Sequence, residues 1–307
     1  MTNSITPTPA VICLTSLSHS GSTVFSMALA CHQNTVSLGE VYQVLREGPE
    51  FWLGANDKVC SCGQPASECE FWGPALRKLT DKQVTSPNAD GYYGQAYQLL
   101  LEEFRRIYSP QMQAIDTSKG VKHLKLLANS NAIDTRIVFL IRDVRSYSCS
   151  QTRLARAQER KGLKKVKGHH WYQMLRWLVN NKKRESLLTS LNLPFITTGY
   201  EPFCFEKDKV LSETFSFLNL PTQHCSANMA ESKHHVLFGN PMRHCKTRKQ
   251  KVHYDSRWFK ETGYLAPAAF LPFVMQYNKA KVYHSDNQTN TDLASPEKPF
   301  PDYEPQP

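Results

Sequence analysis

Short apolar runs alternate with amphipathic stretches along most of the chain. Residues 10–15 are apolar and partly β-branched, which predicts a buried strand. A turn of small residues follows at 16–23, and the apolar positions of residues 24–31 then favour a helix. A strand, a small-residue loop and a helix in this order point backbone N–H groups and a helix N-terminus at an anion.

The same alternation predicts the other elements of the chain. They are helices over 91–108, 171–188 and 209–218, a short element over 113–116, strands over 136–141 and 194–198, and a terminal helix over 264–282 broken by Pro267 and Pro272. The strand at 136–141 is apolar on both faces, as in a central parallel strand. The alternation predicts an α/β fold with a parallel sheet and right-handed crossovers.

A single domain accounts for most of the chain. Residues 10–283 are predicted to form it, preceded by a flexible N-terminus at 1–9. Residues 284–307 are polar and Pro-rich without periodicity, which predicts a disordered tail.

Composition and charge narrow the class of protein. A content of 40% hydrophobic and 21% charged residues among 307 argues against a disordered, collagen-like or coiled-coil protein. No apolar run approaches the roughly 20 residues that cross a bilayer, and residues 1–10 lack the basic start of a signal peptide. A cytoplasmic location is therefore expected. The net charge of +10 predicts an anionic partner.

Three of the nine cysteines, Cys60, Cys62 and Cys69, lie close together in the chain. A zinc site requires four ligands, usually in paired Cys-x-x-Cys or Cys/His units, and this segment supplies three at an unusual spacing. A disulfide-stapled or thiol-containing surface loop is the favoured interpretation. No metal ligands are assigned.

The loop after the first strand is the first candidate anion site. It consists of Ser18, His19, Ser20, Gly21, Ser22 and Thr23. The Walker A pattern requires a lysine before the final Ser or Thr, and this loop has none. An ordinary strand-to-helix turn is the alternative to a phosphate cradle.

A second candidate anion site follows the strand at 136–141. Arg142 stands at the carboxyl end of this strand, and Ser150 lies two turns into the next predicted helix. A guanidinium there can bind phosphate in a bidentate manner, and the serine hydroxyl can add a hydrogen bond. Two alternatives stay open: a surface ion pair with Asp143, and Asp143 acting as a Walker B ligand for magnesium.

Two anion sites suit a nucleotide with phosphate at both ends, and the sequence resembles the sulfotransferases that use 3′-phosphoadenosine-5′-phosphosulfate (PAPS). The loop at 18–23 is similar to their 5′-phosphosulfate loop, and Arg142 and Ser150 have the spacing of their 3′-phosphate motif. The Cys60–Trp72 segment resembles a loop of bacterial members. The resemblance implies a three-layer P-loop-like fold, with a central, mostly parallel sheet flanked by helices.

The resemblance also assigns roles to single residues. Glu40 matches a catalytic glutamate that accepts the acceptor's hydroxyl proton, and Lys119 ends a segment similar to the family's D-[ST]-S-K. His19 stands where many relatives have an arginine that steadies the leaving phosphate. Tyr200 matches a tyrosine beside adenine, and Arg243 matches the basic C-terminal segment that binds the 3′-phosphate.

The leading hypothesis is therefore a PAPS-dependent sulfotransferase without a metal. The acceptor is expected to be a hydroxyl of a small molecule, lipid or carbohydrate, recognised by the cysteine loop and by variable loops within 71–94. Basic residues within 153–167 are expected to form a mobile lid, an anion-recruiting surface or a solvated face. Those within 246–251 are expected to clamp the 3′-phosphate or to form a solvated face, with the solvated face favoured; nucleic acid is not expected. The alternatives are a kinase-like phosphotransferase with a degenerate Walker A loop, and a non-catalytic binder of nucleotides or polyanions.

Overall fold

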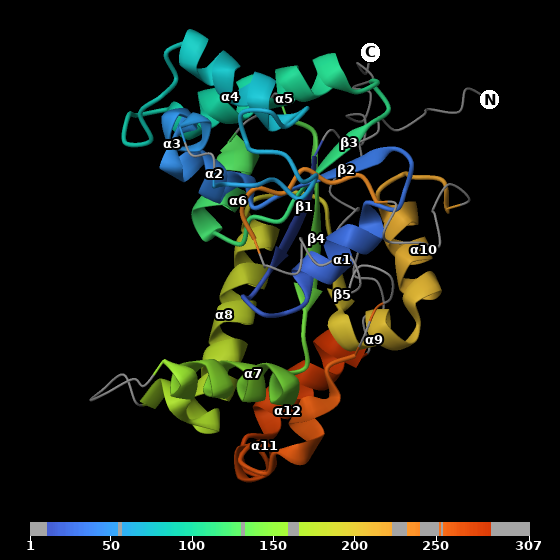
Figure 1. Ribbon diagram of the computed structural model, residues 1–307. Helices are drawn as coiled ribbons and strands as arrows, with labels where there is room; N and C mark the ends of the chain where they lie inside the picture. The colour runs from blue at the N-terminus through green and yellow to red at the C-terminus, as the bar shows by residue number, and fades with distance from the viewer. Residues whose placement is uncertain are drawn as a thin grey trace, which may run out of the picture.

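A computed structural model shows the architecture of the chain (Figure 1). It describes residues 11–54, 57–129, 133–158, 166–222, 232–239, 252 and 254–283. The flexible N-terminus predicted for 1–9 and the disordered tail predicted for 284–307 lie outside these ranges. Within the ranges, no helix combines the length and the apolar character that crossing a bilayer requires.

A five-stranded parallel sheet forms the centre of the molecule. Its strands are β1 (Val11–Ser16), β2 (Thr35–Gly39), β3 (Gln113–Asp116), β4 (Thr135–Ile141) and β5 (Phe195–Gly199). The spatial order is β2-β3-β1-β4-β5, and every neighbouring pair is parallel. The α/β class and the parallel sheet predicted from the sequence are confirmed.

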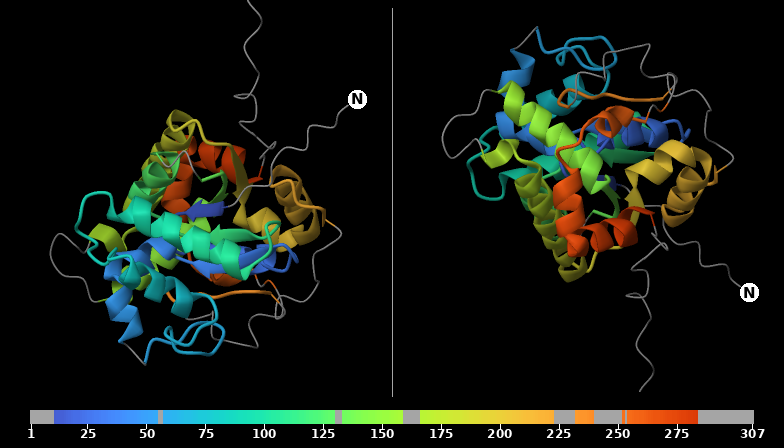
Figure 2. Two further views of the ribbon diagram at one scale, coloured as in Figure 1. Left: turned by 90° about the horizontal axis from the view of Figure 1, so that it is seen from above. Right: turned by 90° about the horizontal axis from the view of Figure 1, so that it is seen from below.

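Helices cover both faces of this sheet (Figure 2). They are α1 (Ser22–Leu29), α2 (Val41–Glu47), α3 (Pro49–Leu53), α4 (Trp72–Asp81), α5 (Tyr92–Ile107), α6 (Val121–Asn129), α7 (Val144–Ala157), α8 (His170–Ser190), α9 (Tyr200–Phe205), α10 (Lys207–Phe217), α11 (Leu265–Phe270) and α12 (Pro272–Asn278). A 3₁₀ turn (Ser256–Lys260) and a π turn (Lys279–Tyr283) flank α11 and α12.

Alternation along the strands builds one hydrophobic core on each face. Ile12, Leu14 and Val138 pack with α1, α9 and α10, whereas Val11 and Phe139 face a larger core formed with helices that include α4, α5 and α8. Successive strand residues point to opposite faces, so a strand that is apolar throughout serves both cores. The result is a three-layer α/β/α arrangement.

The sequence analysis missed β2 and helices α2, α3, α4, α6 and α9. Thr-Val-Ser-Leu-Gly of β2 mixes polar and apolar residues, yet all five are buried. Variable loops were expected within residues 71–94, but the first part of this region is helix α4, whose Trp72, Leu76 and Leu79 are buried in the larger core. The first helix begins at Ser22 rather than Val24, and the terminal helix divides at Leu271, before Pro272.

Candidate active site

The carboxyl ends of β1, β2, β3 and β4 meet at one edge of the sheet. Each strand delivers one predicted site segment there: loop 18–23 after β1, Glu40 after β2, Lys119 after β3 and Arg142 after β4. Parallel strands bring such segments together because all their carboxyl ends lie on the same side.

The loop after β1 holds an open helix N-terminus. Gly21 caps α1 in the left-handed region with a φ of 89°, and His19 also has a positive φ of 66°. No side chain caps α1, and its first turn has no acidic residue. The first N–H groups of a helix have no partner within the helix, so this turn offers donors and a positive dipole end to an anion.

Tyr200 lies directly beneath this loop. A Cβ added to Gly21 would be 2.3 Å from the Tyr200 ring, so only glycine permits the close approach. Burial raises the pKa of Tyr200 above its ordinary value. The guanidinium of Arg142 lies 5.4 Å from the centre of the ring, which places Tyr200 between the two candidate anion sites.

Arg142 connects the two candidate anion sites. Its Nη1 donates to the His19 carbonyl at 2.8 Å, its Nε donates to Ser146 Oγ at 2.7 Å, and its Nη2 donates to Asp255 Oδ2 at 3.2 Å. Arg142 is buried, so these bonds orient a charge that is largely withdrawn from water. Ser150 follows Ser146 by one turn of α7 and therefore lies on the same helix face.

Asp255 is a site residue to which the sequence assigned no individual role. Besides Arg142, Asp255 pairs with Arg257, whose Nε donates to Asp255 Oδ1 at 2.6 Å. Asp255 Oδ2 also lies 3.9 Å from Arg153 Nη2. The hydrogen bond from Arg257 and the charge of Arg142 hold the pKa of Asp255 well below its ordinary value. Asp255 therefore balances a cluster of three arginines.

Asp143 has a structural position at the N-terminus of α7. Oδ1 accepts from the backbone of Arg145 at 2.8 Å, and Oδ2 accepts from Asn278 and Tyr283, each at 2.9 Å. Burial favours a raised pKa for Asp143, but the bonds and charge of Arg145 outweigh it and lower the value. Both oxygens are engaged in protein contacts, which argues against a magnesium-binding Walker B role.

Glu201 lies in contact with Asp143. Its Oε2 accepts from the Asp143 backbone at 2.8 Å. Burial, together with the negative charge of Asp143, raises the pKa of Glu201 to about 8. The Glu201 carboxyl is therefore largely protonated at neutral pH.

Glu40 and Lys119 form an ion pair on the opposite side of the loop. Lys119 Nζ lies 2.5 Å from Glu40 Oε1, and the two side chains are 22% and 13% exposed, respectively. Glu40 stands at the N-terminus of α2, so its carboxylate also lies near a positive helix end. The predicted base and the predicted cation are thus in direct contact.

A buried network positions Lys119. Asp116 accepts from the Ser118 backbone at 2.8 Å and from its hydroxyl at 2.6 Å, and Ser118 Oγ in turn accepts from the Tyr42 backbone at the start of α2. Arg184 of α8 donates to the Lys119 carbonyl at 3.0 Å and to Thr15 Oγ1 of β1. Sequence reasoning missed Arg184, because nothing in the pattern of α8 distinguishes it from a surface arginine.

His19 lies near the charges of Lys119 and Arg142. It keeps exposed surface, but partial burial and then the charges of Lys119 and Arg142 lower its pKa below the ordinary 6.5. His19 is therefore neutral near pH 7 and acts there as a neutral donor or acceptor.

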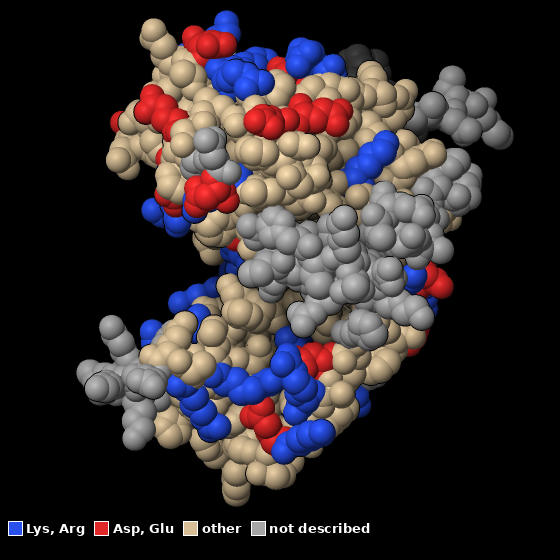
Figure 3. All heavy atoms as spheres, in the orientation of Figure 1, with Lys and Arg blue, Asp and Glu red and all other residues tan. Residues whose placement is uncertain are grey.

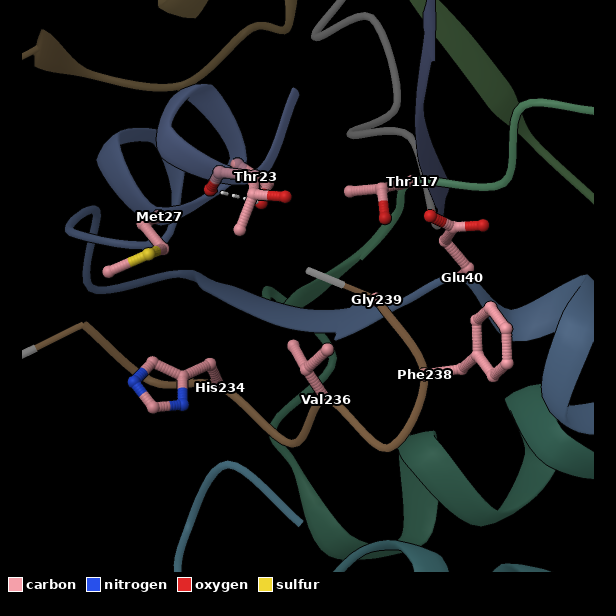
Figure 4. A pocket seen from close by; sticks show the side chains of 10 residues that line it. Thr23, Met27, Glu40, Thr117, His234, Val236, Phe238 and Gly239 are labelled. Atoms are coloured by element: carbon pink, nitrogen blue, oxygen red, sulfur yellow. Dashed lines mark hydrogen bonds between the residues drawn. The ribbon is translucent and has the colours of Figure 1, made fainter. Parts of the chain in front are cut away.

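Two pockets flank the loop. One lies beside Glu40 and is lined by Thr23 of α1, by Thr117 and by residues 234, 236, 238 and 239 (Figure 4). The other, of about 330 Å³, is lined by Ser18 and His19, by α7 and by residues that include Lys167 and Arg176. Lys and Arg side chains gather over α7 on the face shown in Figure 3.

The described residues include only part of the predicted basic segments. Arg243, the basic run at 246–251 and residues 159–165 of the basic stretch lie outside the described ranges. Within the described part of that stretch, Arg153 Nε pairs with Glu261 at 3.1 Å.

Comparison with known proteins identifies the fold. No family model matches the chain, and a search of curated proteins finds no match. The sulfotransferase domain of the Synechococcus PCC 7002 olefin synthase matches with a TM-score of 0.50 at 18% identity, over 89% of this chain and 94% of that domain. Sulfotransferases from Mycobacterium avium and Alicyclobacillus acidocaldarius match with TM-scores of 0.42 and 0.39, each at 13% identity, over 89% of this chain and 77% and 94% of theirs.

The chain therefore has the fold of the sulfotransferase domains. The three-layer, P-loop-like architecture predicted from the sequence is confirmed.

Proposed function

We propose that this protein transfers a sulfuryl group from PAPS to a hydroxyl group of an acceptor. One observation carries the proposal: the open N-terminus of α1 and the anchored Arg142 share a sheet edge with the Glu40–Lys119 pair. Anion donors, a cation and a carboxylate thus surround one loop. The sulfotransferase fold supports the same chemistry.

The donor half of the site consists of loop 18–23, the first turn of α1 and Arg142. The loop and the turn have the free N–H groups and hydroxyls that a 5′-phosphosulfate requires, and no acidic side chain opposes it in that turn. Arg142, with Ser146 and Ser150 on the adjacent face of α7, would bind the 3′-phosphate. Tyr200 would lie below the nucleotide, and Arg243 is proposed from the resemblance alone.

The acceptor half consists of Glu40, Lys119 and the described segment 232–239. Glu40 would accept the proton as the acceptor oxygen attacks sulfur, and the bond from sulfur to the bridging phosphate oxygen would break in line. Lys119 would stabilise the charge on the sulfuryl oxygens, and neutral His19 would donate to the leaving phosphate. The products are a sulfate ester and adenosine 3′,5′-bisphosphate, and no step requires a metal.

Two observations weigh against the kinase-like alternative. The loop lacks the lysine that reaches a γ-phosphate, and Asp143, the Walker B candidate, is engaged by α7, Asn278 and Tyr283. The Glu40–Lys119 pair in turn favours catalysis over simple binding.

Calorimetric measurement of nucleotide binding distinguishes the sulfotransferase from the kinase-like alternative. Adenosine 3′,5′-bisphosphate should bind without a divalent cation and more tightly than ATP with Mg²⁺. Transfer of labelled sulfuryl from PAPS should then be screened over phenols, alcohols, sugars and lipids. Preference for ATP, or a requirement for Mg²⁺, would contradict the proposal; binding without transfer across the screen would favour the non-catalytic alternative.

The proposed class of acceptor rests on the chemistry of the residues that line the pockets. The pocket beside Glu40 combines Met27, Val236 and Phe238 with polar groups, which suits a small-molecule, lipid or carbohydrate hydroxyl attached to an apolar body. The second pocket, which includes Ser18 and His19 of the donor loop, has a positive lining that suits an anionic group. Nucleic acid is not proposed as a partner, and a cytoplasmic location stays a prediction.

A further inference from the structure

Four metal-ligating side chains gather at one point outside the catalytic residues. They are Cys60, Cys62, Cys69 and His235, whose ligand atoms all lie within 4.8 Å of one another. The first three come from one turn of the chain, and the fourth comes from segment 232–239. The sequence predicted a disulfide-stapled or thiol-containing loop, because the fourth ligand is far away along the chain.

The distances suit a tetrahedral metal rather than a disulfide. Cys69 Sγ lies 3.6 Å from Cys60 Sγ, 3.8 Å from Cys62 Sγ and 3.2 Å from His235 Nδ1. Tetrahedral zinc, with Zn–S near 2.3 Å and Zn–N near 2.0 Å, separates its sulfur ligands by about 3.8 Å and sulfur from nitrogen by about 3.5 Å. A disulfide requires about 2.05 Å between two sulfurs, and none of these cysteines is so bonded.

Surrounding groups already hold the ligands in place. The Trp72 backbone N–H points at Cys69 Sγ at 3.5 Å, and the Trp72 indole N–H donates to the His235 carbonyl at 2.5 Å. The turn is closed by hydrogen bonds from Cys60 N to the Gln64 carbonyl at 2.8 Å and from Cys69 N to the Pro65 carbonyl at 2.9 Å. Such outer contacts orient ligands and are typical of metal sites.

We propose that Cys60, Cys62, Cys69 and His235 bind one zinc ion as a structural site. Four protein ligands fill a tetrahedral shell and leave no position for substrate, so the ion is not part of the transfer chemistry. On binding, each of the three thiols releases its proton to solvent, and His235 binds through neutral Nδ1.

The site would fix the segment that closes the pocket beside Glu40. His235 N donates to the Ser37 carbonyl of β2 at 2.7 Å, and Glu40 N donates to the Phe238 carbonyl at 3.3 Å. Gly39 leaves no room for a Cβ, which would be 2.5 Å from Val236. The metal would therefore tie the cysteine turn, segment 232–239 and the base Glu40 into one unit.

The metal content of the full chain tests this directly. The protein, purified under reducing conditions without chelator, should contain about one zinc per chain. After exchange with cobalt, it should show the thiolate-to-cobalt bands and intense visible bands of a tetrahedral sulfur-rich site. Neither readout depends on sulfotransferase activity, so failure of the proposed function leaves this test intact.

Variants locate the ion. Cys62→Ser changes an exposed ligand, and His235→Ala removes the ligand from segment 232–239. Each single variant should weaken zinc binding by at least the 10–100-fold that loss of an outer partner typically costs. Cys204→Ser is the matched control outside the cluster. Cys149→Ser tests the second group of candidate ligands, Cys149, His170 and Glu261; both controls should keep zinc and the cobalt spectrum.

A measurement on the unaltered protein covers the case in which a variant fails to fold. Chelation of the metal should raise amide hydrogen exchange in residues 232–239, with little change in β4. The proposal is overturned if the protein holds no stoichiometric metal, if peptide mapping finds a disulfide among the three cysteines, or if Cys62→Ser keeps the cobalt spectrum unchanged.

Discussion

The proposed donor and acceptor halves of the site are assembled in different ways. In the donor half, each group follows its strand directly: loop 18–23 follows β1 and Arg142 follows β4. In the acceptor half, Glu40 depends on segment 232–239, which reaches β2 from far along the chain through the His235–Ser37 bond. Contiguous motifs thus supply the anion-binding groups of the donor half, although Asp255 also holds Arg142, whereas the pocket of the acceptor half is completed by a segment remote in sequence.

This difference predicts that damage to each half has a distinct kinetic signature. Variants in the donor half should change nucleotide affinity. Variants at Glu40 should change turnover, because its contacts lie with Lys119 and the neighbouring pocket.

Glu40→Gln is expected to have the largest effect, a decrease in kcat. Loss of the general base should lower kcat by about 100–10,000-fold and leave binding of adenosine 3′,5′-bisphosphate unchanged. Steady-state kinetics and calorimetry measure the two quantities, with Glu50→Gln on the exposed face of α3 as the matched control. Full activity of Glu40→Gln across the pH range would remove Glu40 as the base.

Next in size is Arg142→Ala. A lost charge-assisted contact should weaken nucleotide binding by about 1.5–3 kcal/mol, measured by calorimetry. Arg105→Ala, on an exposed position of α5, is the matched control. Because the alanine also leaves Asp255 with fewer partners, the double variant Arg142→Ala/Asp255→Asn should bind as weakly as the single one; recovered affinity would show that the aspartate alone caused the loss.

Gly21→Ala tests the close packing beneath the loop. A φ of 89° costs an alanine about 1–2 kcal/mol, before the contact with Tyr200 is counted. Urea denaturation should show this loss of stability, and binding of adenosine 3′,5′-bisphosphate should fall with it. Gly94→Ala, in an open position of α5, should instead stabilise the protein by about 0.5–1 kcal/mol; equal behaviour of the two variants would contradict the steric argument.

A final comparison, measured as a dependence on pH, contrasts the buried carboxyls of the two halves. Glu201 has a folded pKa of about 8 against an ordinary 4.5, so the folded protein holds a proton that the unfolded chain has released. Stability should therefore fall as pH rises between these values, by at most about 1.4 kcal/mol per pH unit. Asp116 behaves oppositely: burial favours a raised pKa, but His123 and Ser118 lower it below 3.8, and its contribution is lost as pH falls through that lowered value.

Glu201→Gln should flatten the first dependence and leave the acid limb unchanged. Denaturant unfolding at a series of pH values measures both. An unaltered slope between pH 4.5 and 8 in this variant would assign the effect to another group.

The sequence predicted features made by contiguous residues better than features made by long-range contacts. The strand at 136–141 and the loop after β1 were recognised because their signals are contiguous. β2 was missed because its burial comes from neighbours rather than from its own mixed composition. Arg184 and His235 could not be recognised for a related reason: their partners, Lys119 and Cys69, lie far away in sequence.

The strand order also has a consequence for synthesis of the chain. β1 lies between β3 and β4, and Val11 pairs with both Ala114 and Thr135. The loop after β1 therefore leaves the ribosome long before either neighbour of its strand exists. Pairings of such sequence separation form slowly. The loop after β1, although made before either neighbouring strand, should therefore be among the last segments to acquire its native shape.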